Sequence, residues 1–399
     1  MSARDAGRRT APSVVIGSGP GGLTAVQSFR EHDATSPVLM ISADPDPPYA
    51  RPPLTKDYLT GESERSELWL AERRWFTDHD VTLRLGTEVV ALDRAARMLR
   101  LDDGTTQSYE RLILATGSRP QQLQVPGGDD PELILVRDLS SGERLRELAA
   151  THPRVVVIGS GFIGCEAAAS LAVRGADVVL VTGEDVPHLS RLGPEVGRRL
   201  AGWLRAAGVE LLTGSAVSMI ERSGDGWCLH REDGGSVRAE AVVCGGGARP
   251  NTELAERSGL KLDHGGIPTD ASLQTVDEHV LAVGDISYAS NTAAGRRVRV
   301  EHWGDAETHG QIAGAVLAGV DRRWDTAPGF WSTIGGRTLK YAAWGDGYDE
   351  YRVVDDGDAW SVWYGKESVL CGVLAVGDDD AYERGRQQLE QQTPFAAAS

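Results

Sequence analysis

The stretch Ser13-Val-Val-Ile-Gly17-Ser-Gly19-Pro-Gly21-Gly22 joins an apolar, β-branched run to a Gly-x-Gly-x-x-Gly motif. A second copy reads Arg154-Val-Val-Val-Ile-Gly159-Ser-Gly161-Phe-Ile-Gly164-Cys-Glu166 and runs into an Ala-rich stretch typical of a helix. In such motifs the first glycine permits a tight turn, the second lets backbone approach a pyrophosphate, and the third packs helix on strand. The helix N-terminus then faces the phosphates. Two copies predict a protein that holds two dinucleotides, one a flavin and the other a nicotinamide.

The composition is that of a soluble globular protein. The 399 residues suffice for two or three domains. A net charge of −17 argues against nucleic acid and anionic membranes as partners. No run approaches the roughly 18 apolar residues of a membrane helix. The first ten residues lack an apolar signal region, so we expect a cytoplasmic location.

The cysteines are dispersed along the chain, at Cys165, Cys228, Cys244 and Cys371. None forms Cys-x-x-Cys or another close pair, so the sequence predicts neither a redox dithiol nor a metal site. Disulfide-reductase chemistry is therefore disfavoured. Cys165 follows the second glycine turn, and we expect it to pack as a small core residue.

Each glycine motif lies in a predicted βαβ unit. The first has strands at 13–16 and 38–41 around a helix at 23–30, and the second runs from 155 to 181. Asp44 lies just past the strand at 38–41, about 20 residues beyond the last glycine, where an acidic side chain accepts from ribose hydroxyls. The alternative is a turn aspartate before Pro45. Next comes a stiff, proline-rich loop that carries Arg51 and Lys56.

Two apolar strands end in similar segments. Residues 112–115 run into Thr116-Gly117-Ser-Arg119-Pro120, and residues 241–244 are followed by glycines and Arg249-Pro250. Both segments are predicted crossovers between two nucleotide-binding units. After about residue 325, Trp and Tyr cluster and a last helix is expected at 381–390, which indicates a small α+β domain.

These features resemble the ferredoxin-reductase branch of the FAD-dependent pyridine nucleotide-disulfide oxidoreductase superfamily. That branch includes rubredoxin and putidaredoxin reductases, and apoptosis-inducing factor is a relative. The ordered markers are the two glycine motifs, Arg51-Pro-Pro-Leu-Thr-Lys56, Ala115-Thr-Gly-Ser-Arg-Pro120, Ala282-Val-Gly-Asp285, Val300-Glu-His-Trp303 and Phe330-Trp-Ser332.

The resemblance implies an α/β fold with two Rossmann-like, three-layer nucleotide-binding domains of the glutathione-reductase type, plus a small C-terminal α+β interface domain. The FAD domain is expected at 10–120 and 247–324, the NAD(P)H domain at 121–246 and the interface domain at 326–399. The implied cofactor-binding residues are Gly17, Gly19, Pro20, Gly22, Asp44, Arg51, Lys56, Ala115, Thr116, Gly117, Arg119, Gly159, Gly161, Phe162, Ile163, Gly164, Glu166, Thr182, Glu184, Gly246, Gly284, Asp285, Glu301, His302 and Trp303.

Three of these residues are implied to be catalytic: Lys56, Glu166 and Trp303. In the family the lysine of this motif lies beside the reactive edge of the flavin, paired with the glutamate that follows the second glycine motif. A cation there stabilises negative charge on the reduced flavin, and the glutamate keeps Lys56 charged despite burial. The alternative is a purely structural buried ion pair.

The nicotinamide is expected to be NADH, with NADPH as the alternative. Family members usually carry a glutamate at the end of the second strand of the second unit, accepting from the ribose diol. This chain has Thr182 there, and Glu184, two residues on, is the candidate replacement. Arg191 is the nearest arginine downstream.

The residues near 302 allow two interpretations. Trp303 either gates electron exit or shields the flavin from water, and the alternative to both is packing in the core. His302 is a candidate general acid. His309 is expected on a helix surface.

The C-terminal domain departs from the family where Thr333-Ile334 replaces an acidic residue and a glutamine. We expect this change to alter the face that approaches flavin and partner. With the net charge, it weighs against an acidic ferredoxin, unless basic patches at 296–299 or 73–74 attract one.

Three functions therefore stay open. The first is an NAD(P)H-dependent FAD enzyme that reduces a small iron–sulfur carrier of an oxygenase system. The second is a flavoenzyme that reduces a small molecule directly, such as a quinone, a nitro compound or a biosynthetic intermediate. The third is an NADH-sensing interaction protein.

Overall fold

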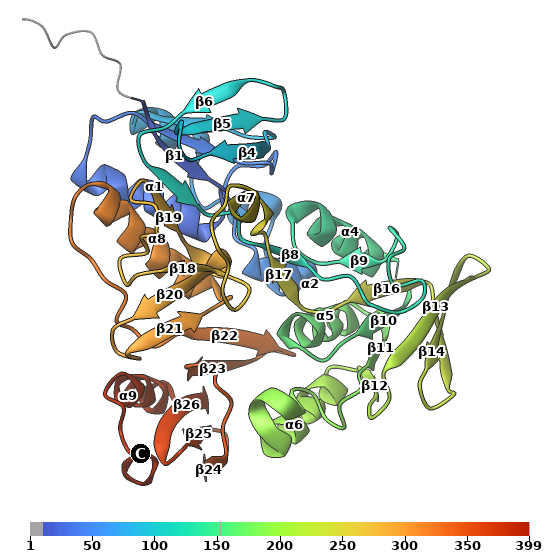
Figure 1. The fold of residues 1–399 in the computed structure, drawn as a ribbon. Helices are drawn as coiled ribbons and strands as arrows, with labels where there is room; N and C mark the ends of the chain where they lie inside the picture. Colours follow the sequence, from blue (N-terminus) through green and yellow to red (C-terminus); the bar gives the residue numbers. More distant parts are fainter. Residues whose placement is uncertain (1–10, 152, 399) are drawn as a thin grey trace, which may run out of the picture.

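The computed structural model describes residues 11–151 and 153–398. Figure 1 shows two nucleotide-binding units side by side, with a C-terminal unit, drawn in red, against both. The two units are built around parallel sheets and the third around an antiparallel sheet. This arrangement confirms the predicted fold class.

The first unit has a parallel five-stranded sheet with β1 at its centre. In spatial order the strands are β19 (Val280–Ala282), β7 (Leu112–Leu114), β1 (Ser13–Ile16), β2 (Val38–Ile41) and β3 (Val81–Arg84). Alternate residues of β1 pack into two different clusters, Val15 with the helices and Val14 with the opposite layer. The continuous apolar run of this strand therefore reflects burial on both faces of the sheet.

The layers on either side of this sheet differ. One is formed by α1 (Pro20–His32) and α8 (Trp303–Leu317), and the other by the antiparallel strands β4 (Val89–Asp93), β5 (Met98–Leu101) and β6 (Thr106–Ser108). A further small sheet consists of β18 (Ile267–Thr269), β20 (Ser287–Asn291) and β21 (Arg296–Arg299). The remaining elements are η1 (Pro52–Thr55), α2 (Asp57–Thr60), η2 (Arg65–Leu68), α3 (Arg73–Asp78), α7 (Glu253–Arg257) and η3 (Gly284–Ile286).

The second unit repeats this plan. Its parallel sheet has the order β12 (Glu210–Leu212), β11 (Asp177–Val181), β10 (Arg154–Ile158), β16 (Ala241–Cys244) and β9 (Ile134–Leu135). Its helices are α4 (Leu139–Ala150), α5 (Phe162–Val173) and α6 (Leu189–Ala206). The opposite layer is the antiparallel sheet of β13 (Val217–Ser223), β14 (Gly226–Arg231) and β15 (Ser236–Ala239). Cys165 is fully buried in this core, as expected.

The chain enters and leaves the second unit through one ribbon. β8 (Ser118–Pro120) and β17 (Ala248–Pro250) pair antiparallel, so Arg119 lies opposite Arg249. The two Arg-Pro segments therefore lie side by side between the sheets, as Figure 1 shows. The exact residues at which one domain gives way to the next stay a prediction.

The C-terminal unit is an antiparallel sheet with a helix against it. The strand order is β22 (Gly329–Ile334), β23 (Arg337–Ala343), β26 (Val369–Val376), β25 (Trp360–Lys366) and β24 (Glu350–Asp355), followed by α9 (Asp379–Glu390) and η4 (Phe395–Ala397). The helix begins two residues earlier than predicted. Asp378 accepts from the Ala381 N–H at 2.9 Å and so caps its first turn.

Helices α1 and α8 approach so closely that glycine is required between them. A Cβ at Gly310 would lie 2.4 Å from the Gly21 carbonyl oxygen, and one at Gly314 would lie 2.2 Å from that of Ala25. The Ser28 hydroxyl donates to the Gln311 carbonyl at 2.8 Å across the same contact. This contact fixes α8, whose N-terminus reaches the cavity described below.

His309 is fully buried, so its predicted place on a helix surface is wrong. The face of α8 that carries His309 is covered by η3 and by Trp324. The imidazole Nδ1 accepts from the Gly284 N–H at 3.3 Å. Burial lowers the pKa of His309 to about 3, so the folded protein holds this ring neutral.

We expect Gly314→Ala to lower the free energy of unfolding by about 1–3 kcal/mol, because its Cβ overlaps backbone that cannot move independently. Gly202→Ala in α6 is the matched control, since a Cβ there meets nothing within 4 Å. It should be neutral or stabilising by up to about 1 kcal/mol. Urea unfolding measures both, and a Gly314→Ala variant as stable as the parent would refute the close-approach argument.

The buried neutral histidine makes stability depend on pH. A histidine in the unfolded chain titrates near 6.5, whereas His309 in the folded chain titrates near 3. Its contribution is therefore complete above about pH 6.5 and is lost as the pH falls toward 3. Urea unfolding of wild type and His309→Gln between roughly pH 4 and 6.5 should give a shallower pH slope for the variant. Equal slopes would contradict this.

Candidate functional site

One large cavity lies where the three units meet. Its volume is about 1810 Å³, well above the roughly 300–1,000 Å³ of a site for one small ligand. Both glycine motifs line it, as do residues of η1, of α8 and of the C-terminal strands β22 and β23. The space therefore has room for two dinucleotides that meet end to end.

The first glycine motif has the geometry expected of a phosphate-binding turn. Gly17 has φ +109°, and a Cβ there would lie 2.1 Å from the Ala115 carbonyl oxygen. A Cβ at Gly22 would lie 2.0 Å from the Gly17 carbonyl oxygen, so this glycine serves helix packing. Gly19 precedes α1, and Pro20 opens it without losing a needed N–H.

The second glycine motif repeats this turn. Gly159 has φ +97°, and a Cβ at Gly164 would lie 2.1 Å from the Gly159 carbonyl oxygen. Gly161 precedes α5 and lines the cavity with Phe162 and Ile163. Gly159 and Gly164 do not line the cavity. The two helix N-termini thus open onto the same space.

A cation with an unused donor lies beside the first turn. The Arg51 guanidinium is 3.9 Å from the Asp44 carboxylate, and its buried Nε has no hydrogen-bond partner among the described residues. The Nη1 atom of the same guanidinium lies 3.2 Å from the position that a Cβ at Gly19 would occupy. Asp44 accepts from the Tyr49 hydroxyl at 2.9 Å and lines the cavity. The Arg51 donors and the glycine turn fit the pyrophosphate of FAD, and the Asp44 carboxylate, an acceptor, fits its ribose.

Asp285 is held by two donors at the end of β19. Its carboxylate accepts from the Ser118 hydroxyl at 2.5 Å and pairs with Arg137 at 3.3 Å. Burial lowers the pKa of Arg137, which lines the cavity with Gly284 and Asp285. The sequence prediction missed Arg137, because nothing in its neighbourhood shows that residues 137 and 285 meet.

Lys56 and Glu166 form the buried ion pair that the family resemblance implies. The Lys56 Nζ is 2.7 Å from the Glu166 carboxylate, which is 2% exposed. The hydroxyls of Thr55 and Ser332 also donate to that carboxylate, at 2.7 and 2.6 Å. The short helix η1, started by two prolines, carries Lys56 to the cavity wall. Thr55 and Ser332 are functional candidates that the sequence prediction missed.

The segment before α8 brings three predicted residues to the cavity. Glu301 pairs with Arg299, the His302 Nδ1 is 2.9 Å from the Asp305 carboxylate, and the Trp303 indole donates to Glu307 at 2.8 Å. Burial raises the pKa values of Asp305 and Glu307. All three predicted residues therefore line the site, each with one polar atom engaged by a neighbouring side chain.

Other predicted residues lie at the edge of the cavity or outside it. Ala115, Thr116 and Gly117 line it, but Gly246 does not. Arg119 is engaged by Asn251 at 2.7 Å and by Glu253, because the β8–β17 ribbon brings these segments together. A phosphate contact by Arg119 stays a prediction, and in this structure its guanidinium forms a partly exposed ion pair with Glu253.

The departure from the family at Thr333-Ile334 lies outside the cavity wall. Phe330 and Trp331 line the cavity, whereas Thr333 and Ile334 do not. The Thr333 hydroxyl bonds that of Thr338, and Ile334 is fully buried in the core of the second unit. Thr333 and Ile334 therefore do not form the cavity wall, and the expectation that they alter the face that approaches flavin and partner stays a prediction.

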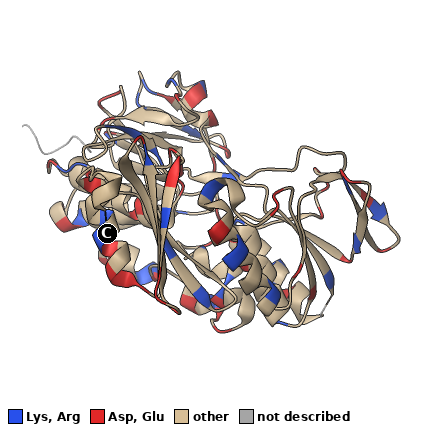
Figure 2. Ribbon diagram, turned by 90° about the horizontal axis from the view of Figure 1, so that it is seen from below, with Lys and Arg blue, Asp and Glu red and all other residues tan. Residues whose placement is uncertain are grey.

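The basic patches proposed from the sequence are largely neutralised by acidic neighbours. Arg296 pairs with Asp346, Arg299 with Glu301, and Arg74 with Asp78 at 3.5 Å. Figure 2 shows basic and acidic residues interspersed along the ribbon. Neither patch is a strong local field for an acidic partner.

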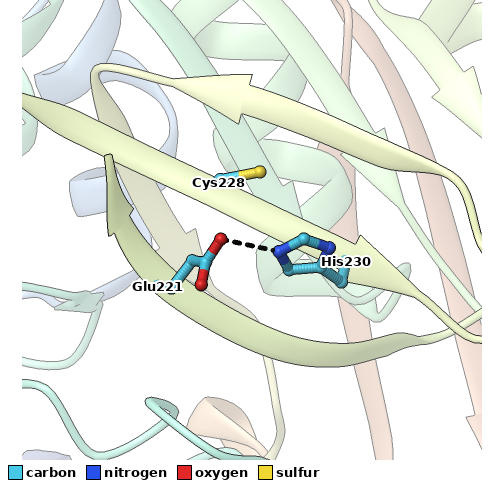
Figure 3. A group of neighbouring side chains, drawn as sticks. All are labelled: Glu221, Cys228 and His230. Atoms are coloured by element: carbon cyan, nitrogen blue, oxygen red, sulfur yellow. Dashed lines mark hydrogen bonds and ion pairs between the residues drawn. The ribbon is translucent and has the colours of Figure 1, made fainter. Parts of the chain in front are cut away.

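One group of potential metal ligands lies outside the cavity. Glu221, Cys228 and His230 share a face of the β13–β14 hairpin, with ligand atoms within 4.8 Å of one another (Figure 3). His230 and Glu221 are hydrogen-bonded at 2.9 Å. Glu221 is exposed, so this pair is satisfied without an ion. The predicted absence of a metal site stays a prediction.

Comparisons with known proteins agree with the site described above. A model of the pyridine nucleotide-disulphide oxidoreductase family matches residues 12–310. The ferredoxin–NAD(+) reductase component of the anthranilate 1,2-dioxygenase system of Burkholderia cepacia is 36% identical over 324 residues, which cover 80% of this chain and 79% of the relative. Rhodocoxin reductase of Rhodococcus erythropolis is 34% identical over 386 residues, covering 96% and 90%.

Two solved structures share the whole fold. The covalent putidaredoxin reductase–putidaredoxin complex contains a chain that is 30% identical with a TM-score of 0.90, covering 96% of this chain and 94% of that one. The ferredoxin reductase for the CYP199A2 system from Rhodopseudomonas palustris is also 30% identical with a TM-score of 0.90, covering 97% and 96%.

The chain therefore belongs to the pyridine nucleotide-disulphide oxidoreductase family. Within it, the protein is an oxidoreductase of the ferredoxin–NAD(+) reductase type, and the family implies FAD and NAD(P)H as its cofactors. Over the described ranges, none of the helices has the length and hydropathy to cross a bilayer.

Replacing Lys56 tests the buried pair. We expect Lys56→Ala to slow flavin reduction by NAD(P)H by on the order of 10²-fold, or to lower flavin content, because the cation at the cavity wall is lost. Lys261→Ala, at an exposed lysine outside the cavity, is the control. Rapid mixing and the absorbance of bound flavin give both quantities. Unchanged kinetics with full flavin content would show that the pair is only structural.

Proposed function

We propose that this protein takes a hydride from NAD(P)H onto bound FAD and passes electrons singly to a small iron–sulfur carrier of an oxygenase system. The observation that carries this proposal is the meeting of two dinucleotide turns and one buried Lys–Glu pair in a single cavity. FAD supplies the chemistry, because it accepts a hydride and releases electrons one at a time.

The chain's own groups have three tasks in this proposal. The first glycine turn and Arg51 hold phosphate, and the second turn presents the reductant. Lys56 places a positive charge at the cavity wall, and Glu166 with its hydroxyl donors keeps that charge fixed in a buried place. Trp303 and Phe330 line the same space and limit the access of water.

The carrier is inferred from the relatives. One relative is named as a component of a dioxygenase system, and one solved structure is a complex with putidaredoxin. Thr333 and Ile334, whose identity weighed against an acidic ferredoxin, lie outside the cavity.

Anaerobic mixing with NADH and, separately, NADPH tests the proposal. The purified protein should contain flavin, and one nucleotide should bleach it quickly. The reduced protein should then reduce a [2Fe–2S] ferredoxin faster than it reduces a quinone. A protein without flavin, or one whose flavin neither nucleotide reduces, would overturn the redox role and favour the sensing protein. Faster reduction of the quinone would favour the small-molecule enzyme.

A further inference from the structure

The two nucleotide-binding units share a hydrogen-bond pattern that reaches beyond their glycines. In the first unit the Ser18 hydroxyl donates to the Ser42 hydroxyl at 2.8 Å, and the Asp44 N–H donates to Ser42 at 3.2 Å. The first glycine of the motif is bound to the neighbouring strand, since the Gly17 N–H donates to the Ile41 carbonyl at 2.8 Å.

The second unit has the same pattern. The Ser160 and Thr182 hydroxyls are 2.8 Å apart, and the Glu184 N–H donates to Thr182 at 3.3 Å. The Gly159 N–H donates to the Val181 carbonyl at 2.9 Å. Residues Ser42 and Thr182 each follow directly after a strand, β2 in one unit and β11 in the other. Thr182 is therefore the counterpart of Ser42, and Glu184 is the counterpart of Asp44.

Thr182 and Glu184 differ in burial and in their access to the cavity, which indicates different roles. Thr182 is buried, its hydroxyl is engaged by Ser160, and it does not line the large cavity. Glu184 is half-buried and does line it. One carboxylate oxygen of Glu184 accepts from the Ser190 N–H at 2.9 Å. A carboxylate has about four acceptor positions, so this anchor leaves capacity for a ligand.

The groups around Glu184 keep it ionised. Burial acts to raise its pKa, but the hydrogen bonds from Ser190 outweigh burial, and the pKa of Glu184 lies below its usual value. The neighbouring His188 is buried, with a pKa of about 4, and is neutral near pH 7. Arg191 is exposed and also lines the cavity, which makes it the cation available to the 2′-phosphate of NADPH.

We infer that Glu184, and not Thr182, accepts from the adenosine ribose hydroxyls of the nicotinamide dinucleotide and makes the protein selective for NADH over NADPH. A carboxylate binds a free ribose diol and repels a 2′-phosphate. The inference rests on the proposed function, because it assigns the nucleotide to the second unit.

The test uses ADP-ribose and 2′-phospho-ADP-ribose, which lack the nicotinamide and so report binding without turnover. Calorimetry on the flavin-loaded protein should show that ADP-ribose binds more tightly. Glu184→Gln should weaken the binding of ADP-ribose by roughly tenfold or more, which corresponds to about 1.4 kcal/mol of binding free energy. It should leave the 2′-phosphorylated ligand unchanged or tighter, and Glu184→Arg should reverse the preference.

Two controls keep the result specific. Asp185→Asn removes an adjacent acidic residue that is exposed and does not line the cavity, and it should change neither affinity. The flavin absorbance spectrum of each variant verifies that the first unit is intact.

The outcomes separate the two proposals. Wild-type protein that binds neither ligand would overturn the proposed function. Wild-type protein that binds ADP-ribose, with a Glu184→Gln variant that binds it equally well, would overturn only the assignment of Glu184. A wild-type preference for the 2′-phosphorylated ligand would also overturn that assignment and would point to Arg191.

Discussion

The Glu166 carboxylate joins the three parts of the molecule. It lies on α5 of the second unit, yet its donors come from η1 and Lys56 of the first unit and from β22 of the C-terminal sheet. A buried carboxylate needs such donors, because an unpaired buried charge costs several kcal/mol. The C-terminal sheet therefore contributes to the charge balance of the cavity as well as to its wall. The position of the C-terminal sheet beside Glu166 and the charge of Lys56 are linked by the same few hydrogen bonds to this carboxylate.

The doubled strand–turn–helix unit sets the remaining geometry. Each turn brings a glycine with positive φ against the backbone of a neighbouring segment, so the helix that follows must start at the cavity. The hydroxyl pairs Ser18–Ser42 and Ser160–Thr182 then tie each turn to the end of the adjacent strand. An acidic residue three positions beyond the strand end, Asp44 or Glu184, thereby lines the cavity in both units.

Local features could be predicted from the sequence, and contacts between distant segments mostly could not. The bounds of β1 and β2 and the two glycine turns follow from short patterns of apolar residues and glycine. The pairing of Lys56 with Glu166 came from family resemblance, since no local signal joins residues 110 positions apart. Ser332 and Arg137 were missed for the same reason. His309 was misplaced because α8 is covered on more than one side, and a helix pattern alone does not show how many neighbours cover it.

The net charge of −17 is a poor guide to what a partner meets at the cavity. Charges separated by more than about 8 Å are largely screened at physiological salt, so the local surface decides. In the 296–299 segment Arg296 and Arg299 are paired with acidic residues, and Arg299 lines the cavity. The apolar Ile163 and Trp331 are nearly half exposed there, at 48% and 46%. A carrier that approaches the flavin therefore meets neutralised charges and apolar side chains, which lessens the repulsion that the overall composition suggests.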